Sequence, residues 1–78
     1  MMHTQFQLTV NDSMPQVTDS FPEQWPQIVA AIEARGGQAT LRSRIIVVEG
    51  ELFCTDGMMK IGDKLVSPWR YEAQVTVR

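Results

Sequence analysis

The residue types that most often perform chemistry are scarce in this chain of 78 residues, which contains one histidine, His3, and one cysteine, Cys54. A metal site requires several clustered His, Cys or carboxylate ligands, and neither a C-x-x-C nor an H-x-x-x-H spacing occurs. A cysteine nucleophile requires a base or a cation beside it, whereas the strand register derived below places Cys54 among apolar residues. We therefore expect a buried core cysteine, no metal and no cofactor.

The glycines and the acidic turn residue also lack a catalytic spacing. Gly36-Gly37, Gly57 and Gly62 do not form a G-x-G-x-x-G or G-x-x-x-x-G-K motif at the start of a helix, so we interpret them as helix caps and turns. Asp56 precedes Gly57, and the turn alone explains it. Because these residues do not combine into a nucleophile, a base and an orienting group, the sequence predicts a protein that is not an enzyme.

Length and charge limit the class of protein further. The chain is long enough for one domain, residues 1–78, and its longest apolar run is far too short to cross a bilayer. The N-terminal residues lack the basic start and apolar core of a signal peptide, and one cysteine cannot form an internal disulfide, so we expect a cytoplasmic protein with no membrane partner. All seven Lys and Arg residues lie from Arg35 onward, which makes the C-terminal half mildly basic although the net charge is −2.

A single amphipathic helix is expected after a capping signal. Ser20 and Glu23 have the spacing of a capping box, and apolar residues follow at helical intervals. This stripe consists of Phe21, Trp25, Ile28, Val29 and Ile32. Pro26 does not fit a helix interior, so either residues 21–25 form a separate turn or the regular helix begins near Pro26. Gly36-Gly37 is expected to end it.

Alternating polar and apolar residues predict strands on both sides of this helix. The strand segments are residues 5–10, 39–48, 65–66 and 70–77, with residues 11–19 as a loop, a turn at Gly62-Asp63-Lys64 and a break at Ser67-Pro68. The residues expected to point inward are Phe6, Leu8 and Val10 in the first strand and Tyr71, Ala73, Val75 and Val77 in the last.

Two turn signals set the register between residues 45 and 61. Asp56-Gly57 favours a two-residue hairpin turn, and Glu49-Gly50 is a weaker signal of the same kind. Together they sort one face as Ile45, Val47, Leu52, Cys54, Met59 and Ile61, and the other as Ile46, Val48, Phe53 and Met58 mixed with Glu51 and Lys60. The first face is apolar throughout, so we expect the helix to cover it. The predicted fold is a two-layer α+β domain of order β-α-β-β-β-β, with one helix packed on a mainly antiparallel sheet of four to five strands.

The second face suggests how the protein acts. One helix cannot cover both faces of a sheet, so apolar residues on the far face must be covered by the 11–19 loop, by Trp69, by a second copy or by another protein. Arginines on the same face would form the polar rim of an interface. The residues predicted to bind a partner are Arg42, Arg44, Ile46, Val48, Phe53 and Met58. We therefore expect a non-catalytic interaction module, a small regulator, adaptor or inhibitor that binds a protein partner and forms a homodimer.

An alternative remains open on the same face. Arg42 and Arg44, with Phe53 as a stacking platform, could bind single-stranded nucleic acid, because sheet-based binders combine aromatic rings with cations. The overall acidity and the nearby glutamates argue against this alternative. Small free-standing domains are often accessory proteins of mobile elements, but this expectation depends on chain length alone and on no particular residue.

Overall fold

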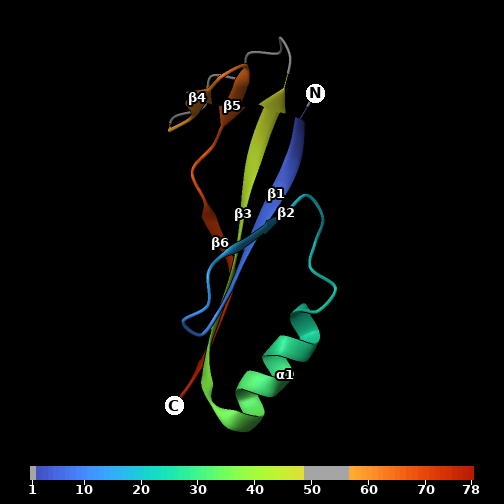
Figure 1. The fold of residues 1–78 in the computed structure, drawn as a ribbon, viewed down its shortest axis with the longest axis vertical. Coiled ribbons are helices and arrows are strands. Elements are labelled where there is room, and N and C mark those ends of the chain that lie inside the picture. Colours follow the sequence, from blue (N-terminus) through green and yellow to red (C-terminus); the bar gives the residue numbers. More distant parts are fainter. Residues whose placement is uncertain (1, 49–56) are drawn as a thin grey trace.

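One helix packs against a six-stranded antiparallel sheet in the computed structural model, which describes residues 2–48 and 57–78 (Figure 1). The elements are β1 (Met2–Val10), β2 (Gln16–Thr18), α1 (Trp25–Arg35), β3 (Gly37–Val48), β4 (Met59–Ile61), β5 (Lys64–Val66) and β6 (Arg70–Val77). The predicted α+β class is confirmed. The short strand β2 lies where the sequence predicted only a loop. The predicted turn at Glu49-Gly50 and the predicted positions of Leu52, Phe53, Cys54 and Asp56 lie outside the described residues.

The long strand β3 is the axis of the sheet. On one side it pairs with the whole of β1, from Met2 opposite Val47 to Val10 opposite Ala39. On its other side two strands follow each other, with β6 beside residues 37–43 and β5 beside residues 46–48. The sheet therefore has two halves, which we call the lower half, beside β6, and the upper half, beside β5 and β4.

Ser67 joins the two halves at the point where β3 changes neighbour. Its Oγ accepts a hydrogen bond from the Ile45 N–H at 2.7 Å, and its own N–H donates to the Ile45 carbonyl at 3.0 Å. The predicted break at Ser67-Pro68 is thus confirmed. The side chain and backbone of Ser67 satisfy polar groups that a continuous strand would otherwise pair.

The part of the core that α1 covers lies in the lower half of the sheet, and Ile46, Val47 and Val66 of the upper half are also buried, at 2%, 2% and 3% exposed. Ala39 and Leu41 of β3 are 0% and 1% exposed, and Leu8 of β1 lies opposite Leu41. From α1, Ile32 is the buried residue, and it contacts the same face of the sheet beside Gly37. Phe6, in contrast, packs edge to face against Phe21 at 5.5 Å between ring centroids.

The prediction that α1 covers Ile45, Val47, Met59 and Ile61 is wrong for the three exposed residues, whereas Val47 is buried, at 2% exposed, in the upper half. The helix packs against β6 and the lower part of β3, and Ile45, Met59 and Ile61 are 44%, 60% and 55% exposed. An 11-residue helix is only about 16 Å long, whereas a 12-residue strand is about 40 Å long. One helix of this length cannot follow β3 into the upper half.

Proline and glycine define the ends of α1. The helix begins at Trp25 with Pro26 in its first turn, which confirms the second of the two sequence interpretations. The predicted capping box is wrong, because Gln24 is the N-cap residue and no side chain caps the helix. At the other end Gly36 has φ 81° and its N–H donates to the Ile32 carbonyl at 2.7 Å, so the predicted glycine end is confirmed.

The molecule is elongated, with extents of 46 × 21 × 17 Å (Figure 1). Its radius of gyration is 14.6 Å, whereas a compact chain of this length has one of about 11.5 Å. Its accessible surface is 5808 Å², whereas a monomer of 8.8 kDa typically exposes about 4,800 Å². The single chain therefore leaves about 1,000 Å² more surface in water than its mass requires.

Two substitutions in β3 test where the core lies. Leu41→Ala should lower the free energy of unfolding by about 3 kcal/mol, because the buried side chain leaves a cavity. Ile45→Ala, on the same face of the same strand, should cost less than about 1 kcal/mol, because its side chain is already 44% exposed. Urea denaturation at one protein concentration measures both. Equal losses would show that Ile45 is as deeply buried as Leu41 in solution, which would contradict its exposure in the structure.

Candidate functional site

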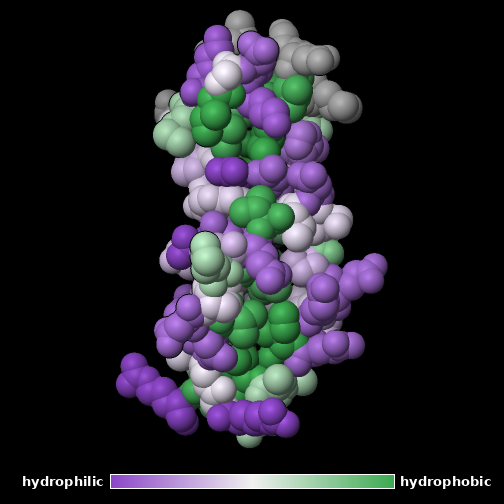
Figure 2. Space-filling model, viewed as in Figure 1, coloured by the Kyte–Doolittle hydropathy of each residue, from purple (hydrophilic) through white to green (hydrophobic). Residues whose placement is uncertain are grey.

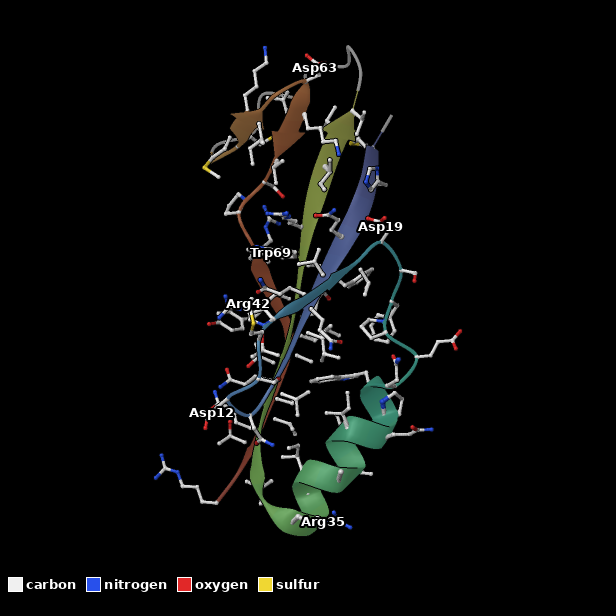
Figure 3. All side chains as sticks on the ribbon, viewed as in Figure 1. Asp12, Asp19, Arg35, Arg42, Asp63 and Trp69 are labelled. Carbon is white, nitrogen blue, oxygen red and sulfur yellow. The ribbon has the colours of Figure 1, made fainter. Side chains whose placement is uncertain are left out.

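Two arginines and two aromatic residues lie on the sheet face opposite α1, and we call this group the arginine–aromatic face. It consists of Arg42, Arg44, Trp69 and Tyr71. The Arg42 guanidinium lies 4.5 Å from the centre of the Tyr71 ring, and the Arg44 guanidinium lies 4.1 Å from that of Trp69. Figure 3 shows Arg42 and Trp69 on the side of the sheet away from the helix. Such contacts are attractive because the guanidinium charge lies over the negative face of each ring.

Hydrogen bonds fix both guanidinium groups further. Arg42 donates to the Tyr71 hydroxyl at 2.7 Å, and Arg44 donates to the Gln5 side-chain oxygen from Nε at 3.1 Å and from Nη2 at 2.9 Å. The same Gln5 amide donates to Asp19 at 3.4 Å. All the described partners of the two guanidinium groups are neutral, and the nearby carboxylate of Asp19 lies beyond Gln5.

A β-bulge brings Tyr71 to this face. Leu41 lies opposite Ala73 and Arg42 opposite Tyr71, so Glu72 is an extra residue in β6. The extra residue reverses the side to which Tyr71 points, and the prediction that Tyr71 lies inward is wrong, since it is 64% exposed. Glu72 instead accepts a hydrogen bond from the Ser43 hydroxyl.

The upper half of the sheet carries the second exposed group, which we call the apolar end. In the register of β3, β5 and β4, Ile46 lies opposite Val66 and Val66 opposite Met59, so these three residues share one face. Ile61 lies opposite Lys64, and Lys64 lies opposite Val48, which is two residues from Ile46 in β3, so Ile61 shares the same face. Met59 and Ile61, 60% and 55% exposed, therefore lie on the Ile46 face and not with Ile45 and Val47 as predicted.

The surface colouring agrees with two separate apolar regions. Figure 2 shows hydrophobic residues near the β4–β5 end and again at the level of α1, with a mainly hydrophilic stretch between them. The lower region belongs to the core described above. The upper one includes the apolar end, whose exposed side chains have no helix over them among the described residues.

The structure separates the six residues predicted to bind a partner. Arg42 and Arg44 lie together on the arginine–aromatic face and are half-buried. Ile46 is 2% exposed, so the expectation that a single chain leaves it in water is wrong, and it belongs to the packing of the upper half. Val48 and Met58 are half-buried. Phe53 lies outside the described residues.

No protein-family model, curated protein or solved structure matches the chain. Within residues 2–48 and 57–78, three or more His, Cys, Asp or Glu side chains do not gather as they would around a metal ion. In the same part of the chain, α1 is too short and too polar to cross a membrane. The candidate site therefore rests on the geometry of the arginine–aromatic face and the apolar end.

A double-mutant cycle tests the arginine–aromatic face. Arg44→Ala and Trp69→Ala should each destabilise the fold, and the double variant should lose less than the sum, with a coupling energy of about 1 kcal/mol. Chemical denaturation of the four proteins gives this value. Strict additivity would mean that the stacking of Arg44 on Trp69 contributes nothing in solution.

Proposed function

We propose that the chain is a non-catalytic protein-interaction module, a small regulator, adaptor or inhibitor that associates with itself and binds a second macromolecule. The observation that carries this proposal is the surplus of exposed surface, about 1,000 Å² above the expectation for a monomer of this mass. A stable protein–protein interface buries about 800 Å² on each partner. The surplus is therefore large enough for one such interface.

The distribution of exposed apolar side chains supports the same proposal. Met59 and Ile61 extend from the apolar end, and Met2 and Ile45 are 51% and 44% exposed in the upper half. Large apolar side chains in water favour association, because burying them between two proteins removes them from water. The arginine–aromatic face borders this region with groups that interfaces contain more often than other surfaces.

Sedimentation velocity tests the proposed self-association. We expect a species of about 17.6 kDa, twice the 8.8 kDa of one chain, to form between about 1 and 100 µM. A protein that remains a monomer throughout this range would contradict the proposal, because the surplus surface would then remain in water.

A second candidate function rests on the arginine–aromatic face. Tyr71 and Trp69 are aromatic rings beside two cations on an open sheet, an arrangement that binds single-stranded nucleic acid in other proteins. We rank it second because each guanidinium group already stacks on a ring of its own chain. In addition, the net charge is −2 and Asp19 lies at the border of this face.

Fluorescence anisotropy with a single-stranded oligonucleotide of about 15 nucleotides decides between the two candidates. At about 0.15 M salt we expect no dissociation constant below about 1 µM. A tighter, salt-sensitive complex that the double variant Arg42→Ala/Arg44→Ala abolishes would reverse the ranking. Gln74→Ala/Thr76→Ala is the matched control, because both residues are exposed and uncharged.

A further inference from the structure

Strand β6 forms one edge of the lower half of the sheet. It pairs with β3 on one side, and on its other side no strand lies beside it among the described residues. The other edges are formed by β2 and β4, which have three residues each, and by residues 2–5 of β1, which extend beyond β2, whereas β6 has eight residues. The length of β6 makes it the best template in the described structure for pairing with another strand.

The second part of β6 lacks the features that usually prevent such pairing. Residues 73–77 read Ala-Gln-Val-Thr-Val, with no charged residue and no proline. The bulge at Glu72 interrupts the strand before this stretch, and Arg78 follows it. Natural edge strands are normally protected by charges, prolines or bulges within the exposed stretch itself. This edge is protected at its ends and open between them.

We propose that the outer edge of β6, residues 73–77, pairs antiparallel with the same edge of a second copy of this chain, with the two-fold axis at Val75. This rests on the proposed self-association and assigns it to a surface. In an antiparallel pair, two residues that lie opposite each other either both form the hydrogen bonds between the strands or both do not. A two-fold axis that places a residue opposite its own copy is therefore compatible with the hydrogen bonding of the pair. Val75 is the centre of the regular stretch between the bulge and Arg78.

The extent of the uncharged stretch favours this register over its neighbour. With the axis at Val75, all five uncharged residues pair with the same stretch of the second copy, Ala73 opposite Val77 and Gln74 opposite Thr76. With the axis at Gln74, Thr76 would lie opposite Glu72, so the bulge and a charged residue would fall inside the paired stretch. The pairing at Val75 therefore keeps the bulge and the charged residues outside the paired stretch.

In this arrangement the apolar end lies outside the contact between the two copies. Residues 73–77 lie beside residues 37–41 of β3, whereas β4 and β5 lie at the other end of the long axis (Figure 1). Since the paired β6 strands run antiparallel, the two apolar ends point in opposite directions. The dimer thus presents two copies of Met59 and Ile61 to other macromolecules, which is the geometry of an adaptor.

Disulfide cross-linking tests the register in the full chain with Cys54→Ser as background. Gln74→Cys and Thr76→Cys are both exposed and should not disturb the core. In the proposed register residue 74 lies about 5 Å from residue 76 of the second copy, measured between Cα atoms, which is within disulfide reach. Equal residues lie about 8 Å apart, which is beyond it. Mixing the two variants under mild oxidation should therefore give a covalent dimer, whereas each variant alone should not.

Each outcome of this experiment has a defined meaning. Cross-linking of Gln74→Cys with itself would place the axis at Gln74 and overturn the proposed register. A wild-type dimer in sedimentation with no cross-link in any mixture would overturn the β6 edge and leave the proposed self-association standing. A monomeric wild type would overturn both. The double variant Met59→Glu/Ile61→Glu is the control, because both residues belong to the apolar end, away from residues 73–77, and their substitution should leave the dimer intact.

Opposite and like charges give a second measurement that needs no cysteine. Gln74→Glu/Thr76→Lys places opposite charges across the two edges, and Gln74→Lys/Thr76→Lys places like charges there. We expect the dimer dissociation constant of the second variant to exceed that of the first by about tenfold or more, measured by sedimentation equilibrium. Equal constants would overturn the proposed pairing of residue 74 with residue 76.

Discussion

The length mismatch between one helix and the central strand is the constraint on which the rest of the structure depends. Strand β3 has 12 residues and α1 has 11, but a strand rises more than twice as far per residue as a helix. A two-layer core can therefore form only over the lower half of the sheet. The elongated shape, the surplus of surface and the exposure of Ile45 all follow from this mismatch.

Local side-chain contacts stabilise the parts of the sheet that α1 does not cover. Ser67 satisfies the backbone of Ile45 where β3 changes neighbour, and Arg44 stacks on Trp69 above the face that α1 leaves open. The alkyl part of an arginine side chain can shield apolar surface while the guanidinium stays partly in water. These contacts stabilise the upper half and the open face, but within residues 2–48 and 57–78 they leave the outer edge of β6 without a neighbouring strand.

Local patterns in the sequence predicted a large part of this fold. Alternation indicated β1, β3 and β6, and Pro26 and Gly36 indicated the two ends of α1, because each signal depends on neighbouring residues only. The shared face of Arg42 and Arg44 follows from the two-residue period of a strand.

The remaining features depend on contacts between distant segments. β2 exists because three residues pair with β1, and no local signal marks them. The bulge at Glu72 reverses Tyr71, and an alternating sequence contains no sign of it. The pairing of β5 with β3 placed Met59 on the Ile46 face, which the expected meander did not indicate. For this reason the sequence identified Arg42 and Arg44 of the arginine–aromatic face, named Trp69 only as one possible cover of that face, and missed Tyr71.

The outer edge of β6 and the apolar end are the two surfaces to which the proposed association is assigned. Amide hydrogen exchange, followed residue by residue at two protein concentrations, tests the pairing of β6 with a second copy most directly. We expect the outward amides of residues 73–77 to become protected as concentration rises, while those of residues 2–5, whose outer side has no strand beside it among the described residues, exchange equally fast at both concentrations. Fast exchange along the outer edge of β6 at every concentration would contradict this pairing.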